Sequence, residues 1–311
     1  MPWTLLSLLA LHWLLGRPDP GPLLPGDLLA RVRMARARTL VVQYQHLDLR
    51  DLDQADPDVL IVDSSRDGSG AGEWTRAEVA RLRERPDGTS RILLAYLSIG
   101  EAEDYRSYWP RQGSPPSFAG PENPRWPGNH RVRHWTPAWH RVIFGTPSSF
   151  VDRMVDRGFD GLFLDTVDSC EVWEQEGRIG ACGEMADLVR HLARHGRSLR
   201  RDLVVVANNP FPIWDQPGIR GALTGAMSED RFFRGGRMIR GRALEEALSP
   251  LREARRGGLA ILVLEYPRTA AGRRDLTELC RQEGFLCHAS TPSLDTIGHI
   301  LAPGTPPREG R

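Results

Sequence analysis

The chain contains no lysine: all 41 of its basic residues are arginine. This absence excludes mechanisms that need a lysine amine, such as those of Schiff-base aldolases, pyridoxal-phosphate enzymes and Walker-type phosphate-binding loops. An excess of either charge is also missing, because 41 basic residues stand against 40 acidic ones and leave a net charge of +1. Such a balance gives no electrostatic footprint for nucleic acid, so we expect no nucleic-acid partner.

The N-terminal apolar run at residues 5–15, LLSLLALHWLL, is too short to span a bilayer, so we expect no stable membrane insertion. Its length fits the apolar part of a signal peptide, which we assign to residues 1–16. A buried N-terminal helix is the alternative. Residues 17–37 then form a Pro/Gly linker and lead-in, residues 38–301 a single domain, and residues 302–311 a disordered tail. This order predicts a secreted or periplasmic protein.

Cysteine is scarce and lacks the C-x-x-C spacing of zinc sites. Cys170 and Cys182 form one local pair in the sequence, and Cys280 and Cys287 form another. In an exported protein this spacing predicts two disulfides that each close one loop. Four free thiols in a cytosolic protein are the alternative.

Eight short apolar segments predict strands, and helical patterns separate most of them. The expected strands are 40–45, 59–63, 91–98, 161–165, 203–208, 222–228, 259–266 and 285–290. The expected helices are 75–85, with Thr75 as N-cap, 147–157, 183–196, 242–256 and 272–283. Eight strands in a chain of this length favour an α/β fold of the (β/α)₈ TIM-barrel type in one domain. An open doubly wound sheet is the runner-up, but its G-x-G-x-x-G turn is missing.

A long segment rich in proline and tryptophan, residues 101–140, follows the third strand. It is too long for a simple connection, so we interpret it as a functional insertion. Its tryptophans are Trp109, Trp126, Trp135 and Trp139. They either stack on sugar faces or pack the insertion itself.

The stretch 158–169, GFDGLFLDTVDS, places Asp165 at the tip of a buried strand. A carboxylate in this position loses hydration. Either neighbouring groups must compensate for this cost, or the carboxylate takes part in chemistry. Asp168, shortly behind it, is equally well explained as the cap of the following helix.

In a barrel the C-terminal strand ends converge on one face, and here they carry many carboxylates. Two carboxylates with aromatic neighbours are the usual equipment of a glycosidase, and we choose Asp165 and Glu229 as the catalytic pair. The expected substrate-binding residues are Tyr44, Asp63, Ser98, Glu101, Asp168, Asn208, Glu265 and Tyr266. Glu101 and Glu265 are also reserve catalytic acids, or structural partners for Arg106 or Arg268.

Clustered carboxylates also suit Mg²⁺ or Mn²⁺. Metal-using barrels usually add histidine at strand ends, and only His46 and His288 fall near one. We therefore expect no metal and no other cofactor. An acidic mouth on a nearly neutral protein should attract a cationic or neutral ligand, such as an amino sugar.

Two long motifs resemble the glycoside hydrolase family 114 domain: LAYLSIGEAEDYRSYW at 94–109 and GFDGLFLDTVDS at 158–169. HWTPAWHRVI at 134–143 and VLEY at 263–266 follow in a similar order, with Asn208 after strand five and Glu229 after strand six. The similarity covers residues 38–301. It implies a TIM-type barrel that cuts α-1,4-linked galactosamine polymers.

Carried over residue by residue, the resemblance implies that Asp165 is the catalytic Asp, Glu229 the catalytic Glu and Asp63 a substrate-binding acid. This chain departs from the family pattern at two places, after strand five and after strand six. It reads Asn208-Asn209-Pro210 where many relatives read N-G, and residues 227–231 read MSEDR where many read into E-S-L.

The sequence thus predicts a secreted, monomeric endo-glycosidase for galactosamine-rich polysaccharide that acts with retention. A non-catalytic protein that binds the same amino-sugar polymer is one alternative. A glycosidase for a different α-linked or N-acetylated sugar is another.

Overall fold

The computed structural model describes residues 25–301. The signal peptide expected at 1–16, the first part of the lead-in and the tail expected at 302–311 lie outside these residues.

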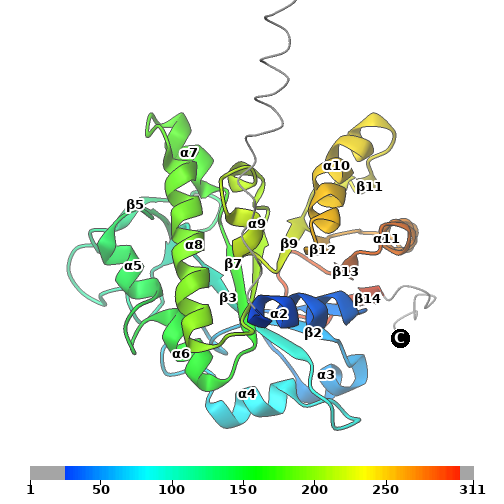
Figure 1. Ribbon diagram of the computed structural model, residues 1–311, viewed down its shortest axis with the longest axis horizontal. Coiled ribbons are helices and arrows are strands. Elements are labelled where there is room, and N and C mark those ends of the chain that lie inside the picture. Colours follow the sequence, from blue (N-terminus) through cyan, green and yellow to red (C-terminus); the bar gives the residue numbers. More distant parts are fainter. Residues whose placement is uncertain (1–24, 302–311) are drawn as a thin grey trace, which may run out of the picture.

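The main sheet contains all eight predicted strands, which run parallel to one another, and curves into a nearly closed barrel (Figure 1). In sheet order the parallel strands are β1 (Leu40–Val42), β2 (Val59–Asp63), β3 (Ile92–Ser98), β7 (Gly161–Asp165), β8 (Val204–Asn208), β9 (Gly225–Glu229), β12 (Ala260–Glu265) and β13 (Leu286–Ala289). The sixth of them begins at Gly225 rather than at 222, because a short helix runs through Ala222. The α/β barrel prediction is confirmed.

A ninth strand, β14 (His299–Leu301), was not predicted and pairs antiparallel with β13. Within the described residues, β1 and β13 are not joined by a backbone ladder. Instead the Val42 N–H donates a hydrogen bond to His288 Nδ1 at 3.3 Å. A side chain therefore helps to close the barrel.

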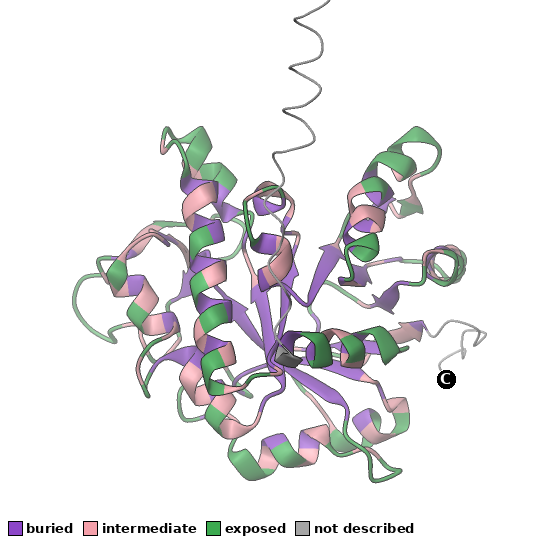
Figure 2. Cartoon of the chain, viewed as in Figure 1, coloured by how far each residue is buried: buried purple, intermediate pink, exposed green. Residues whose placement is uncertain are grey.

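Helices surround the strands, and Figure 2 shows buried strands in the middle with exposed helix faces on the outside. The helices are α2 (Pro25–Arg36), α3 (Leu49–Ala55), α4 (Arg76–Arg83), α5 (Pro137–Ile143), α6 (Phe150–Arg157), α7 (Ser169–Gln175), α8 (Ala181–Leu199), α9 (Ile219–Ala222), α10 (Arg242–Arg256) and α11 (Ala270–Glu283), with a 3₁₀ turn at Phe211–Ile213. Thr75 caps α4 as predicted, and Glu78 completes a capping box with it. None of the helices in residues 25–301 is long and apolar enough to cross a membrane.

The lead-in expected at 17–37 contains a helix, α2, that covers one end of the barrel (dark blue in Figure 1). Ala30 and Met34 are buried together with apolar side chains that point into the barrel, such as Leu40 and Phe163. Asp27 in its first turn and Arg36 in its last turn suit the helix dipole. This segment is therefore part of the folded domain rather than a linker.

At the same end, Asp160 lies immediately before β7 and is fully buried. Its carboxylate accepts hydrogen bonds from Arg33, Arg83 and Arg200 and from the Leu93 N–H, at 2.8–3.1 Å. A buried carboxylate is stable only when paired in this way, so Asp160 ties α2, α4, α8 and two strands together.

The predicted insertion after the third strand is present and has a small sheet of its own. Its antiparallel strands are β4 (Glu101–Glu103), β5 (Ala119–Glu122) and β6 (Asn129–Val132), in the order β4-β6-β5. Elsewhere the structure joins Cys170 to Cys182 and Cys280 to Cys287, the two pairs that the spacing predicts. The first disulfide links α7 to α8, and the second links α11 to β13.

Candidate active site

Three polar side chains stand at the C-terminal ends of consecutive strands: Asp165 on β7, Asn208 on β8 and Glu229 on β9. Alternation along each strand points them to the barrel interior, the side occupied by Phe163, Val206 and Met227. This shared direction brings the two predicted catalytic carboxylates to one place at the mouth.

Each of these three residues is followed by one in the left-handed backbone conformation: Thr166 (φ 59°), Asn209 (φ 41°) and Asp230 (φ 52°). The conformation is costly for threonine, whose side chain is branched at Cβ. The Thr166 hydroxyl is held by hydrogen bonds: it accepts one from Gly100 N–H at 2.8 Å and donates one to the Asp165 carbonyl oxygen at 2.7 Å. Sharp turns therefore end all three strands and fix where their last side chains point.

Asn208 bridges the two carboxylates. Its Nδ2 donates to Asp165 Oδ1 at 2.9 Å and to Glu229 Oε2 at 2.5 Å. The two acceptor oxygens are therefore at most about 5.4 Å apart, the sum of these distances. The sequence predicted Asn208 as a substrate-binding residue, whereas here its amide is used to hold the pair.

A tyrosine hydroxyl completes the contacts of each carboxylate. Tyr96 on β3 donates to Asp165 Oδ2 at 3.0 Å, and the Tyr266 hydroxyl donates a short hydrogen bond to Glu229 Oε1. Tyr266 was predicted from the sequence as a site residue, whereas Tyr96 was not. Its position two residues before Ser98, on the same strand face as the strand end, was the available signal.

The surroundings of Glu229 favour its protonated form. Desolvation, followed by repulsion from Asp165, raises its pKa to about 6, although the hydrogen bonds from Tyr266 and Asn208 act in the opposite direction. It can therefore be protonated in weakly acidic conditions, as a general acid must be.

Two other predicted residues line the same mouth. The ring of Tyr44 packs on that of Tyr96, with centroids 4.5 Å apart. Asp168 is exposed at the surface, but the residues that surround it at the mouth partly desolvate its carboxylate. This desolvation, with repulsion from Asp165, raises its pKa to about 6. Asp168 stands at the N-cap position of α7, as the alternative interpretation expected, but its side chain makes no capping hydrogen bond.

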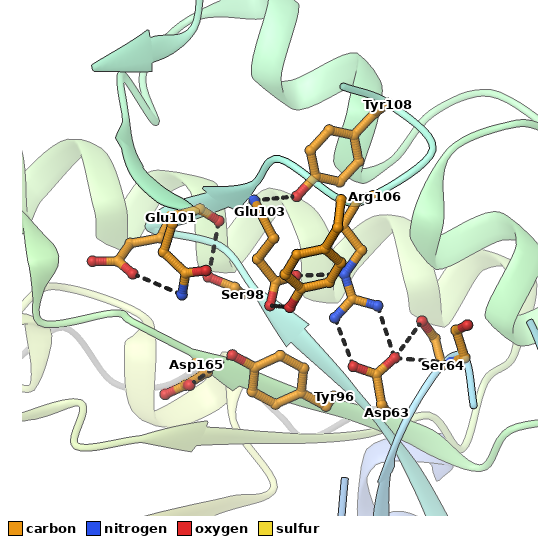
Figure 3. A network of polar contacts seen from close by, with 12 residues as sticks. Asp63, Ser64, Tyr96, Ser98, Glu101, Glu103, Arg106, Tyr108 and Asp165 are labelled. Carbon is orange, nitrogen blue, oxygen red and sulfur yellow. Dashed lines mark hydrogen bonds and ion pairs between the residues drawn. The ribbon is translucent and has the colours of Figure 1, made fainter. Parts of the chain in front are cut away.

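Glu101 and Ser98 lie where the insertion meets the barrel (Figure 3). Glu101 is buried and accepts hydrogen bonds from the side-chain amides of Asn123 at 2.8 Å and Asn129 at 3.4 Å. Burial raises its pKa. Ser98 is also buried, and its hydroxyl donates to the Glu101 carbonyl oxygen at 2.9 Å. Both residues thus support the loop that carries the two asparagines.

Asp63 is engaged by an arginine rather than open to a ligand. Arg106 forms a two-pronged contact with it, at 2.8 and 2.6 Å, and also binds Glu103 at 2.5 Å (Figure 3). These two carboxylates hold the pKa of Arg106 above its usual value, despite its burial. The network fastens the insertion to β2.

Glu265 does not reach the mouth. Its neighbours Leu264 and Tyr266 belong to the interior face of β12, so Glu265 points to the outer face. It is fully buried there, and its Oε1 accepts from the backbone N–H groups of Arg231 and Phe232 at 2.8 Å each. Desolvation raises its pKa to about 7. Its contacts are those of a support for the segment after β9.

The four tryptophans of the insertion differ in their surroundings. Trp139 is fully buried, Trp109 packs on His130 with centroids 4.6 Å apart, and Trp135 lies under Arg178. Trp126 is 58% exposed. It sits in the loop between Asn123 and Asn129, the two residues that bind Glu101.

The mouth keeps four carboxylates without an arginine partner among the described residues: Glu101, Asp165, Asp168 and Glu229. Other acids are neutralised by arginine, such as Asp63 by Arg106 and Glu73 by Arg153 and Arg157. In residues 25–301, no group of three or more His, Cys, Asp or Glu has the arrangement of a metal site.

Comparison with known proteins agrees with this geometry. The model of glycoside-hydrolase family GH114 matches residues 42–301. An uncharacterised protein of Thermotoga maritima is 30% identical over 231 residues, which cover 72% of this chain and 69% of that protein. One of Methanocaldococcus jannaschii is 29% identical over 252 residues, or 78% and 70% of the two chains.

Among solved structures, the glycoside hydrolase domain of PelA from Pseudomonas aeruginosa has a similar fold. The TM-score is 0.60 at 21% identity, over 84% of this chain and 97% of that one. A family match that spans nearly the whole described chain, on a barrel that presents two carboxylates at its mouth, establishes the assignment. The chain belongs to glycoside-hydrolase family GH114 and is a glycoside hydrolase.

Proposed function

We propose that this glycoside hydrolase is a secreted, endo-acting enzyme that cleaves α-1,4-linked galactosamine polysaccharide with retention of configuration. Asp165 is the nucleophile and Glu229 the acid/base. The observation that carries the proposal is the Asn208 bridge. It keeps the nearest oxygens of the two carboxylates within about 5.4 Å, whereas inverting enzymes need about 6.5–9.5 Å between their carboxyl groups.

In the first step an Asp165 oxygen attacks the anomeric carbon of the sugar at the cleavage point. The bond from that carbon to the leaving oxygen breaks, and Glu229 gives its proton to that oxygen. The hydrogen bonds from Tyr96 and Asn208 stabilise the ionised Asp165 until it attacks.

In the second step Glu229, now ionised, takes a proton from water. The water oxygen attacks the anomeric carbon, the ester bond to Asp165 breaks, and Asp165 leaves as a carboxylate. Each step inverts the configuration at the anomeric carbon, so the two steps together retain it. Hydrogen bonds from Tyr266 and Asn208 stabilise the ionised Glu229 in this step, while desolvation favours its protonated form in the first.

The unpaired acids of the mouth support a cationic substrate. Glu101, Asp165, Asp168 and Glu229 form no ion pair with an arginine among the described residues, and although Arg231 lies near enough to Asp168 for their charges to interact, the excess of acids gives a negative potential that attracts ammonium groups. Galactosamine without its acetyl group carries such a group at each unit. Tyr44 and Asp168 are the residues that we assign to contact the sugar directly.

Export is supported by two disulfides, which form and persist in oxidising compartments. We therefore retain the assignment of residues 1–16 as a signal peptide and of the barrel domain as a secreted or periplasmic enzyme.

The test is reducing-end release and product mass from α-1,4-galactosamine oligomers of graded acetylation. Wild type, Asp165→Asn and Glu229→Gln are compared. We expect internal cleavage by wild type, fastest on the least acetylated oligomers, and a loss of about 10² or more in both variants. Cleavage of only fully acetylated oligomers would overturn the substrate, and activity that survives either substitution would overturn the role of that residue.

A further inference from the structure

The segment that follows β9 and Asp230 is strongly basic. Residues 231–242, RFFRGGRMIRGR, contain five arginines and no acid, in a chain whose net charge is only +1. Arg231, at its start, lies over the ring of Phe211 at the mouth, 4.1 Å from the ring centroid. The remaining arginines extend away from the strand end, and neither the catalytic pair nor its hydrogen-bond partners use them.

This segment folds into a hairpin of β10 (Phe233–Arg234) and β11 (Arg237–Met238). The register places Arg234 directly opposite Arg237. Gly235 and Gly236 make the turn with φ of 57° and 77°, a conformation that glycine adopts without strain. Two like charges in directly opposed positions destabilise a hairpin, so this pair favours a state in which an anion lies between or beside them.

A third arginine stands beside the turn. Arg268 follows β12, and its Cδ lies 3.9 Å from the point where a Cβ on Gly236 would be. Among the described residues, Arg234, Arg237 and Arg268 contact no carboxylate, whereas Arg240 nearby is paired with Asp275 at 2.9 Å. Two arginines without a carboxylate partner among the described residues, Arg237 and Arg268, thus lie beside the turn.

These groups border a groove of about 720 Å³ between the hairpin and α11. Its walls include Arg237, Met238, Arg268 and Gly272, and also Arg240 and Asp275, which are paired with each other. The first turn of α11 also lines it, and Thr269 caps that helix by accepting from Gly272 N–H at 3.0 Å. The positive end of the helix dipole adds to the potential of the arginines.

The hairpin is held in a fixed position relative to the groove. Glu265 accepts hydrogen bonds from the backbone at Arg231 and Phe232. Phe233 is buried and packs so closely on Gly272 that a Cβ there would lie 3.1 Å from its ring. A preformed site of this kind loses little entropy when a ligand binds.

We propose that this groove is an anion-binding site for the carboxylate groups of an acidic polysaccharide, separate from the acidic mouth. Arginine forks pair with carboxylates in two-pronged contacts. The residues that line the groove include no aromatic ring, which disfavours single-stranded nucleic acid because its bases need stacking surfaces. Arg268 is two residues from Tyr266, so the groove adjoins the mouth and suits a second glycan chain next to the one being cut.

The test is isothermal titration of the full chain with an oligogalacturonate at low ionic strength, repeated at higher salt. A neutral dextran of equal length and a DNA duplex serve as comparison ligands. The variants are Arg237→Gln and Arg268→Gln. Arg76→Gln, which removes the same charge from exposed α4, is the matched control.

We expect oligogalacturonate to bind, to bind more weakly as salt rises, and to lose roughly tenfold in affinity in each groove variant but not in the control. No binding, or equal binding by wild type and groove variants, would overturn the site. Duplex DNA that binds as tightly as the oligogalacturonate would overturn the choice of polysaccharide. Because binding is measured without turnover, failure here is distinguishable from failure of the proposed hydrolase activity.

Discussion

The side chain of Asn209 holds both backbone groups of Glu229. Its Oδ1 accepts a hydrogen bond from the Glu229 N–H at 3.1 Å, and its Nδ2 donates to the Glu229 carbonyl oxygen at 3.4 Å. Asn209 has a left-handed backbone, which asparagine tolerates better than most residues. It therefore acts as a positioning residue for the proposed acid/base, from the strand next to it.

This relationship predicts the effect of Asn209→Gly. Glycine keeps the left-handed backbone without strain but removes both side-chain hydrogen bonds. We expect kcat to fall by roughly thirtyfold, since two hydrogen bonds worth about 1 kcal/mol each are lost, with KM nearly unchanged. Asn209→Asp keeps the acceptor and should recover part of kcat. A rise in KM with unchanged kcat would mean that Asn209 contacts substrate instead.

The bond from Tyr266 to Glu229 predicts a shift in the pH profile. The hydroxyl stabilises the ionised Glu229, so Tyr266→Phe should raise the pKa of Glu229 above its value of about 6. Because the general acid must be protonated, activity falls as pH rises through this pKa. The alkaline limb of kcat/KM should therefore move up by about one unit in Tyr266→Phe.

Tyr44→Phe is the matched control for this measurement. It removes a hydroxyl from the same mouth that makes no hydrogen bond to Glu229. The alkaline limb of the kcat/KM pH profile of Tyr44→Phe should stay at the same pH as in wild type. A limb that moves to lower pH in Tyr266→Phe would contradict the proposed role of Glu229.

Trp126 is the exposed tryptophan of the insertion, and its loop is fixed by Asn123 and Asn129 on Glu101. Such a ring offers a platform for a sugar face beyond the cleavage point. We expect Trp126→Ala to raise KM for long oligomers about tenfold, with little change for short ones that cannot reach it. Trp126→Phe should recover most of the loss. Equal effects on short and long oligomers would exclude a distal sugar contact.

The carboxylate of Asp160 predicts a large effect on stability at the opposite end of the barrel. Asp160→Asn leaves Arg33, Arg83 and Arg200 without their shared charge. Because these arginines are 23–29% exposed, water offsets part of the loss. We expect urea unfolding to show a loss of about 2–3 kcal/mol. Asp202→Asn, which removes a more exposed partner of Arg33 and Arg200, should cost less than about 1 kcal/mol.

Glu265 predicts a pH dependence of stability. Its folded pKa of about 7 lies above the ordinary value for glutamate. The folded state therefore binds its proton more tightly than the unfolded state, and the contribution of Glu265 is lost as pH rises from the ordinary value through 7. Buried His288, whose pKa is lowered to about 4, acts in the opposite direction between pH 4 and its ordinary value.

Because these two groups oppose each other, the informative quantity is the difference between wild type and Glu265→Gln. We expect the variant to gain about 2–3 kcal/mol relative to wild type between pH 4.5 and pH 7.5. Urea unfolding at both pH values measures it. A difference that does not change with pH would show that Glu265 ionises normally in the folded protein.

The sequence was sufficient for the strands and for the ends that carry chemistry. Apolar segments bounded by glycine and polar residues are a local signal, which is why β7 and β8 were located almost to the residue. The disulfide pairs were also local. β14 was missed because three residues, His299–Leu301, are too few to show a period.

The direction of a side chain at a strand end was harder to predict. Glu265 and Tyr266 are adjacent and face opposite sides of β12, yet both sides of a parallel barrel strand are apolar. Because polar and apolar residues do not alternate along such a strand, the sequence does not show which residues point into the barrel. Both residues were therefore expected at the mouth. Asp63 was expected to bind substrate from its position after a strand and from the family resemblance. Its pairing with Arg106 could not be foreseen, because the two residues are 43 positions apart and such a pairing leaves no periodic trace in the sequence.

The stereochemistry of the first turnover tests the central claim most directly. Proton NMR should follow the anomeric signals while wild type cleaves an α-1,4-galactosamine oligomer, before mutarotation mixes them. The α anomer appearing first, with no signal from Asp165→Asn or Glu229→Gln, is the predicted result, because Asp165 must form and release a covalent ester. The β anomer appearing first would show inversion and contradict the assignment of Asp165 as nucleophile.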